Sequence, residues 1–291
     1  MSNPLLSERF FGQTNQGAVG HGSPGWGSAQ PGQAPPPVPP GYDAGERSPW
    51  QGPGATRTMT YGGVTSATGA LLLLVIVGGI FGWTQVTETS LGIDQTGKEV
   101  FSTNLPAGLF FGSMILGFVL AIGASFKPNL ARFLAPAYAL VQGVFVGMIS
   151  RMYDARFDGI VVQAVLATVA VFAVMLVLYG MRILRATPRF TKGVIAATFG
   201  IMAVYMVGFI ASLFGANMRF WNEPSPLGIG ISIVIVIVAS LNLILDFDFI
   251  EKGVKNGLPK QMEWFAAFGL VVTLVWLYLE MLRLLSLLQQ R

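Results

Sequence analysis

The sequence predicts an all-α integral membrane protein, a bundle of seven transmembrane helices preceded by a disordered N-terminal tail. Of the 291 residues, 53% are hydrophobic and only 11% are charged, whereas about a quarter of the residues of an average soluble protein are charged. The apolar residues also form runs of about 20, which is the length at which a helix crosses the hydrocarbon core of a bilayer. This clustering excludes a soluble helical protein.

Residues 1–57 form the tail, which is rich in Gly, Pro, Ser and Gln and has PGQAPPPVPP at its centre. A segment of this composition buries too little apolar surface to offset its ordering entropy, so we expect disorder. The proline run could dock on an aromatic groove as a polyproline II ligand, but a plain spacer is the simpler interpretation. No apolar stretch of a secretory signal peptide precedes the first run. We therefore expect the first span to act as the insertion signal for a membrane domain over residues 58–291.

Seven runs qualify as membrane spans, and each can be a helix because a helix satisfies its own backbone hydrogen bonds in lipid. They are Thr65–Trp83, Leu105–Phe126, Leu134–Ser150, Gly159–Tyr179, Gly193–Phe214, Leu227–Leu245 and Met262–Leu288. Small residues four apart are typical of helices that pack closely in membranes. Gly78 and Gly82 in the first span, Gly143 and Gly147 in the third, and Gly208 and Ser212 in the fifth have this spacing, although chance pairing in a glycine-rich chain is the alternative.

The loops between the spans alternate in charge. The second, fourth and sixth loops carry an excess of Lys and Arg, as does the tail with Arg47 and Arg57, while the first loop is acidic. Cationic loops stay in the cytoplasm, so we expect a cytoplasmic N-terminus and a C-terminus on the opposite side, unless the last span dips in and returns. The net charge of +4 is then a topology signal, and the expected partner is the lipid bilayer rather than nucleic acid.

The sequence carries no enzymatic signature. There is no cysteine, and the one histidine, His21, lies in the tail, so no thiolate or histidine site can be built inside the membrane. Serine–histidine arrangements, the H-E-x-x-H zinc motif, phosphate-binding loops and nucleotide fingerprints are missing from the sequence. We therefore predict a protein that is not an enzyme and that uses no cofactor.

Polar residues that could carry a function lie at the end of the sixth span. This run ends in Asp246, Asp248 and Glu251, and acids at the end of a membrane-length run are costly unless they meet water or a partner. Asn242 and Asp246 are four residues apart and therefore share one helix face, whereas Asp248 points elsewhere. Asp246 is thus the candidate for a protonatable or cation-binding gate, with a helix end that simply reaches water as the alternative.

The remaining acids of the region receive structural interpretations. We expect Asp248 and Glu251 to lie in a solvated turn together with the lysines that follow. In the seventh span, a stripe of small and polar residues that includes Thr273 and Glu280 should face the protein interior. Arg283, three residues after Glu280, is placed to form an ion pair with it.

Four segments are similar to those of a known family. They are MTYGGVTSATGALLLL at the first span, LAPAYALVQGVFVGMIS at the third, LDFDFIEKG after the sixth and MEWFAAFGLVVTLVWLYLEMLRLL in the seventh. Together they resemble the Bax-inhibitor family of transmembrane proteins, in its bacterial YccA-like branch, from about Met59 to Leu288. The resemblance implies a bacterial plasma-membrane protein whose last helix is central and wrapped by the other six. It also implies a pH-sensitive calcium leak gated by two aspartates, one on the sixth helix and one on the seventh.

The two family aspartates are carried over by position. Asp246 matches the first because Ile250 supplies the hydrophobic residue found four positions later, and Asp248 is the second choice. The alignment of the last helix places Thr273 where the second aspartate belongs. Two carboxylates held close share a proton and titrate as a coupled pair, which a threonine cannot do. The resemblance therefore implies an altered pH response.

The resulting prediction is a cation leak channel that transports Ca²⁺. Its expected gate and ion pathway consist of Asp246, Thr273, Asn242, Glu280 and Asp248. The alternative is a regulatory membrane protein that acts without transport by binding another membrane protein, such as a quality-control protease. A solute transporter would show broken helices in matching halves of the chain, and the sequence shows no such repeat.

Overall fold

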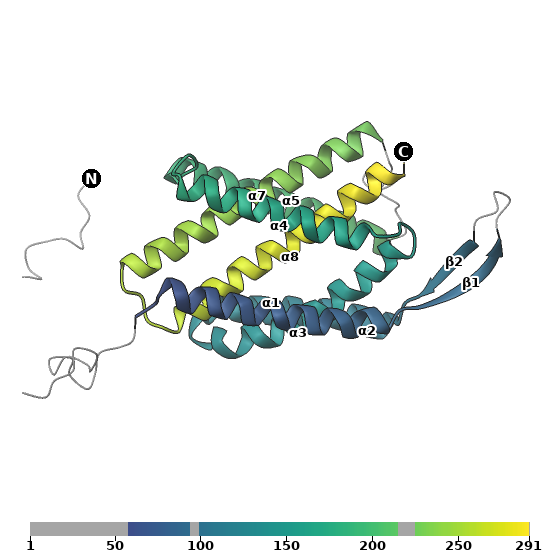
Figure 1. Ribbon diagram of the computed structural model, residues 1–291, viewed down its shortest axis with the longest axis horizontal. Coiled ribbons are helices and arrows are strands. Elements are labelled where there is room, and N and C mark those ends of the chain that lie inside the picture. The colour runs from purple at the N-terminus through teal and green to yellow at the C-terminus, as the bar shows by residue number, and fades with distance from the viewer. Residues whose placement is uncertain (1–57, 94–98, 215–224, 291) are drawn as a thin grey trace, which may run out of the picture. The chain divides into compact units, whose positions relative to one another are not determined.

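The computed structural model describes residues 58–93, 99–214 and 225–290. In this part of the chain, seven helices are long and apolar enough to cross a membrane, which confirms the predicted fold class (Figure 1). They are α1 (Tyr61–Thr84), α2 (Ala107–Phe126), α3 (Ala131–Asp154), α4 (Ile160–Gly180), α5 (Pro188–Leu213), α7 (Pro226–Lys255) and α8 (Met262–Gln289). A 3-10 turn, η3 (Pro128–Leu130), leads into α3. The predicted disordered tail and its proline run lie outside the described residues.

Hydroxyl side chains fix where three of the helices begin. The hydroxyl of Thr60 accepts a hydrogen bond from the Gly63 amide at the start of α1, and Thr187 and Ser225 play the same part before α5 and α7. In the last two cases a proline follows the cap, where its missing N–H is not needed. These caps explain why the helices begin before the apolar runs that predicted them.

The end of α7 corrects one prediction. Asp248 and Glu251 do not lie in a solvated turn, because α7 continues as a helix to Lys255. The Asp248 carboxylate pairs with the Lys252 ammonium at 2.6 Å, and Glu251 pairs with Lys255 in the same way. Ion pairs four residues apart stabilise a helix surface, so the acids and lysines extend the helix beyond the apolar run.

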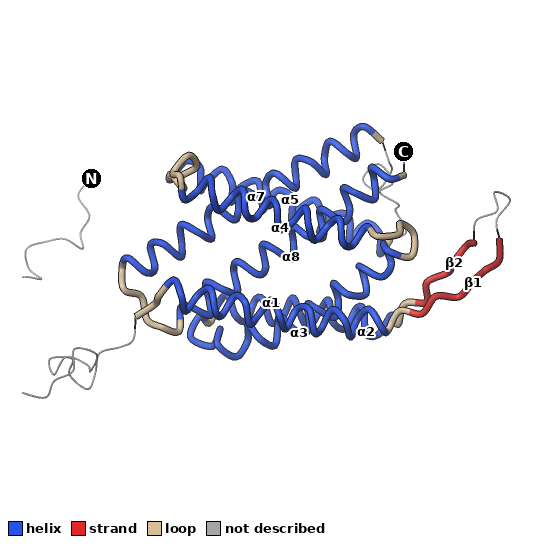
Figure 2. The backbone as a smooth tube through the Cα atoms, viewed as in Figure 1, coloured by secondary structure: helices blue, strands red, loops and turns tan. Residues whose placement is uncertain are grey.

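The connection between α1 and α2 contains a β-hairpin that was not predicted. Strands β1 (Thr87–Ile93) and β2 (Glu99–Asn104) pair antiparallel, with Thr87 opposite Asn104 and a register irregularity between Ser90 and Gly92. Figure 2 shows the two strands extending away from the helices. Thr87, Thr89 and Ile93 in β1 and Val100 and Thr103 in β2 are β-branched, and such residues favour a pleated backbone.

Helix α8 lies at the centre of the bundle, as the resemblance implies. It packs against α1 and α3 on one side and against α4 and α7 on the other, so it runs between two layers of helices (Figure 1). Each layer has its own aromatic contact, with Tyr138 edge-on to Phe268 at 5.1 Å in the first and Phe172 edge-on to Phe247 at 5.7 Å in the second. Helices α2 and α5 lie at the edges, where they pack on α3 and α7.

Glycines bring α1 and α3 into backbone contact, which confirms the close packing predicted for the first and third spans. A Cβ atom on Gly82 would overlap the Val144 carbonyl, and one on Gly147 would overlap the Gly79 carbonyl. Gly78 and Gly143 are equally constrained by the opposite helix. Close approach of this kind maximises van der Waals contact between helices in lipid, where the hydrophobic effect does not hold them together.

A single methyl group in this contact should therefore destabilise the bundle. We expect Gly82→Ala to lower the free energy of unfolding by about 1–3 kcal/mol, because the backbone must shift to accept the methyl group. Gly69→Ala, on the same helix but with open space around the Cβ position, is the control and should be neutral or slightly stabilising. Thermal unfolding of the purified protein in detergent measures both, and equal melting temperatures would contradict the close-contact interpretation.

Candidate functional site

The carboxyl group of Asp246 faces the central helix. Its Oδ1 atom lies 3.5 Å from the position that a Cβ atom on Gly269 of α8 would occupy, so the glycine leaves room for the acid. Its Oδ2 atom is buried and has no hydrogen-bond partner among the described residues. Buried polar atoms are nearly always hydrogen-bonded in proteins, and an exception requires an explanation.

Thr273 lies beside this carboxyl group, one helical turn after Gly269. Its side chain is buried, and its hydroxyl donates to the Gly269 carbonyl at 3.2 Å. Thr273 is also the side chain that interacts with the Asp246 carboxyl. The structure thus brings together the two positions that the alignment paired, one on α7 and one on α8.

Two other predicted site residues have different surroundings. The Asn242 amide donates to the Thr198 hydroxyl of α5 at 2.8 Å and to the Val238 carbonyl at 2.9 Å, so it joins α7 to α5. Asp248 is partly exposed and paired with Lys252. Neither side chain joins the contact between Asp246 and Thr273.

Glu280 belongs to a separate buried cluster, two turns beyond Thr273 on α8. The Tyr205 hydroxyl of α5 donates to Glu280 Oε1, and Arg283 donates to the same hydroxyl at 2.9 Å. Arg283 also lies 3.6 Å from Glu280 Oε2, which is the predicted ion pair. Both charged side chains are less than a tenth exposed. Burial of an ion pair requires extra hydrogen bonds. Tyr205 supplies one to Glu280 Oε1 and accepts one from Arg283, whereas Glu280 Oε2 has the ion pair but no hydrogen bond among the described residues.

A further acid, Glu263, was not singled out by the sequence. It is 4% exposed, and its Oε1 accepts hydrogen bonds from both the amide and the hydroxyl of Thr60, each at 3.0 Å. Through these hydrogen bonds, Glu263 joins the start of α8 to the start of α1. A carboxylate in the first turn of a helix is also favoured by the helix dipole. The two residues are 203 positions apart, and no local sequence signal marks such a pair.

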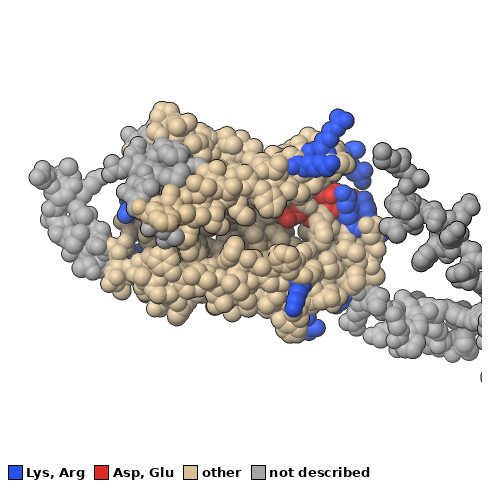
Figure 3. All heavy atoms as spheres, turned by 180° about the vertical axis from the view of Figure 1, so that it is seen from behind, with Lys and Arg blue, Asp and Glu red and all other residues tan. Residues whose placement is uncertain are grey.

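The charged side chains are distributed unevenly over the surface. In Figure 3, Lys and Arg side chains gather at one end of the visible face, and acidic side chains lie in a hollow beside them. No group of three His, Cys, Asp or Glu side chains placed to hold a metal ion is found in the described segments.

The comparison with protein-family models identifies the family. The model described as Bax inhibitor 1 like matches residues 3–290. The chain belongs to the Bax inhibitor 1-like family. A search of curated proteins gives no match. This Bax inhibitor 1-like chain is therefore an integral multi-pass membrane protein, in agreement with its seven apolar helices.

In this Bax inhibitor 1-like protein, the Tyr205 hydroxyl should be needed for stability. Tyr205→Phe leaves Glu280 and Arg283 buried with one shared partner fewer, so we expect a loss of about 1–3 kcal/mol in the free energy of unfolding. Tyr61→Phe serves as the control, because Tyr61 is 52% exposed and should change little. Thermal unfolding in detergent compares the two variants, and a Tyr205→Phe protein as stable as the control would contradict a structural role for the cluster.

Proposed function

We propose that this Bax inhibitor 1-like protein is a cation leak channel, that Ca²⁺ is its transported ion and that Asp246 is its gate. The observation that carries the proposal is the buried Oδ2 atom of Asp246, which has no hydrogen-bond partner among the described residues. An acid inside a membrane protein is a functional-site candidate by default, because its burial is costly and a neutral side chain in its place would avoid that cost. Its position against the central helix supports a role in a path through the bundle.

The chemistry of the site suits a leak better than tight ion binding. An ionised Asp246 carboxylate attracts a cation, and the Thr273 hydroxyl beside it can add one neutral oxygen ligand. Calcium sites that bind tightly use six to eight oxygen ligands with several carboxylates. Conduction instead requires binding that is weak enough for the ion to leave. A proton competes with the cation for the carboxylate, which makes the leak pH-dependent.

The proposal includes the placement of the protein. The alternation of basic and acidic loops supports a cytoplasmic N-terminus in a bacterial plasma membrane, and the segment similarities support the YccA-like branch. The basic end of the bundle, with Lys252 and Lys255 at the end of α7, is then the cytoplasmic end, and Asp246 lies near it.

The first test of the gate removes its charge. We expect Asp246→Asn to lower calcium flux at neutral pH by roughly tenfold, equivalent to about 1.4 kcal/mol in the barrier, because an amide cannot attract the cation. The variant should also lose the pH dependence of the wild type, since the titrating group is gone. The measurement uses purified protein in liposomes loaded with a calcium-sensitive dye, at several pH values.

Asp248→Asn is the matched control for this test. It removes the same charge two residues away, from an acid that is paired with Lys252 on the helix surface, and should leave flux unchanged. Equal effects of the two substitutions would contradict the assignment of Asp246. Wild-type flux no greater than that of empty vesicles at every pH would exclude the channel and leave the partner-binding alternative.

The second test concerns the threonine. Thr273→Asp places a second carboxyl beside Asp246, and two close carboxyls share a proton and titrate in two coupled steps. We therefore expect a new step in the pH profile of calcium flux, absent from the wild type. The same substitution in the Asp246→Asn background should remove that step, and a profile that is identical with and without Asp246 would refute the pairing.

A further inference from the structure

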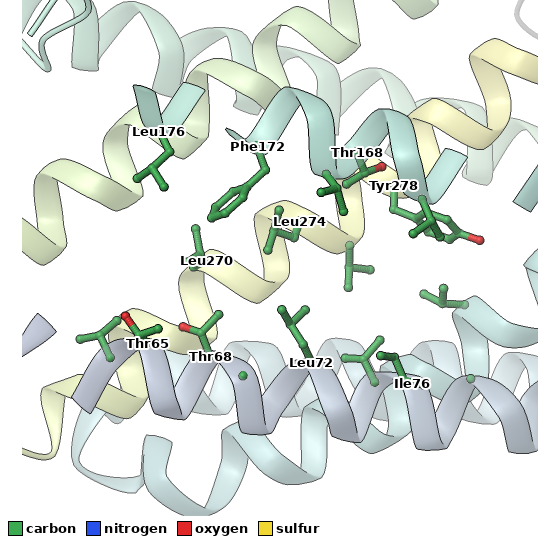
Figure 4. A pocket seen from close by; sticks show the side chains of 18 of the residues that line it. Thr65, Thr68, Leu72, Ile76, Thr168, Phe172, Leu176, Leu270, Leu274 and Tyr278 are labelled. Atoms are coloured by element: carbon green, nitrogen blue, oxygen red, sulfur yellow. The ribbon is translucent and has the colours of Figure 1, made fainter. Parts of the chain in front are cut away.

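A groove of about 1210 Å³ lies between α1 and α4, with α8 as its floor (Figure 4). Its lining on α1 extends from Tyr61 to Thr84, which is about 35 Å at the rise of an α-helix. The groove is therefore as long as the hydrocarbon core of a bilayer is thick. In Figure 4, side chains from α1 and α4 point into it from opposite sides.

The walls of the groove are apolar and open to the surroundings. Ile76 and Ile80 on α1 and Val169 on α4 line it and are each more than half exposed. In a membrane, such an opening faces lipid tails. An apolar space of this size holds little ordered water, so the tails of neighbouring lipids are the material that fills it.

One polar side chain inside the groove lacks a partner. The Thr68 hydroxyl is buried without a hydrogen bond among the described residues, and the side chain is 9% exposed. Figure 4 shows the Thr68 side chain extending from α1 toward the groove. Thr65 and Thr168, which also line the groove, donate to carbonyls of their own helices. Of these three threonines, only Thr68 has a hydroxyl available to donate to an occupant of the groove, for example to an ester carbonyl.

The groove has one basic end. Glu251 lines this end together with Tyr61 and Tyr179, and the Tyr179 hydroxyl donates to Glu251. Two acids lie at this end, because Asp248 as well as Glu251 acts on Tyr179, and three cations offset them. Lys252 and Lys255 pair with the two acids, and Arg182 lies close enough to interact with Glu251 electrostatically. The excess of positive charge matches a phosphate group.

The opposite end of the groove is balanced. Arg151 lies over the Trp83 ring there and pairs with Asp154 at 3.7 Å. The charge difference between the ends therefore gives an occupant a direction, with its anionic group at the end where α7 and α4 terminate.

We propose that the groove binds an anionic phospholipid taken from the bilayer. One acyl chain lies between α1 and α4 on the floor formed by α8, an ester carbonyl accepts a hydrogen bond from Thr68, and the phosphate lies beside Arg182 and Lys255. This lipid site does not depend on calcium transport. It would exist in a partner-binding protein as well as in a channel.

Native mass spectrometry of the full-length protein released from detergent tests the proposal. The protein is offered phosphatidylglycerol or phosphatidylcholine with identical acyl chains, and we expect it to retain phosphatidylglycerol several-fold better. Leu72→Trp, which fills the groove, should abolish retention. Leu73→Trp is the matched control, because Leu73 is 64% exposed and lies outside the groove lining. It should retain lipid as the wild type does.

Two milder variants keep the proposal testable if Leu72→Trp fails to fold. Thr68→Val keeps the side-chain volume and should weaken retention of both lipids, whereas Lys255→Gln should reduce the preference for phosphatidylglycerol without abolishing binding. Equal retention of the two lipids by the wild type would overturn the headgroup assignment. Equal lipid retention by the Leu72→Trp and Leu73→Trp proteins would overturn the lipid as occupant. A dimer that forms in place of lipid adducts, and that only Leu72→Trp abolishes, would do the same and indicate a second copy of the chain in the groove.

Discussion

The arrangement of the bundle depends on keeping the polar side chains of α8 away from hydrocarbon. Glu263, Thr273, Glu280, Arg283 and Ser286 are each less than a tenth exposed, although a membrane-spanning helix that carries them would be costly to place in lipid. Shielding them requires neighbours on more than one side, which α1, α3, α4 and α7 provide. Helix α2 lies at one edge, and α5 lies at the other, from which its Tyr205 reaches Glu280 and Arg283 of α8.

Two acids in the membrane-spanning helices, Glu280 and Asp246, show how similar residues receive different roles. Glu280 is held by a tyrosine hydroxyl from α5 and an arginine from its own helix, so its charge is compensated inside the protein. Asp246 faces a glycine and a threonine, and nothing positive in those contacts balances it. An acid whose partners are already present stabilises the fold, whereas an acid without them is available to a proton or a cation. The second situation is the reason for assigning the gate to Asp246.

The seven helices could be predicted because lipid imposes one local rule, an apolar run of about 20 residues for each crossing. That rule ends at the membrane surface, where it failed for the last turns of α7, since Asp248 and Glu251 continue the helix through their lysine partners. The hairpin after α1 was missed for the same reason, because it lies beyond the apolar run. The contacts of Tyr205 and Glu263 join helices far apart in the chain, so spacing could not reveal them. The polar stripe of the last span included Thr273, but only family similarity paired it with Asp246.

Helix α8 also links the candidate gate to the groove between α1 and α4, because one turn of α8 contributes residues to both. Gly269 faces Asp246, and the next residue, Leu270, lines the groove. Successive residues of a helix point about 100° apart, so the gate and the groove lie on adjacent faces of one rigid element. A small rotation or shift of α8 would alter both together. Occupancy of the groove can therefore change the gate only to the extent that a lipid binds one position of α8 more tightly than another.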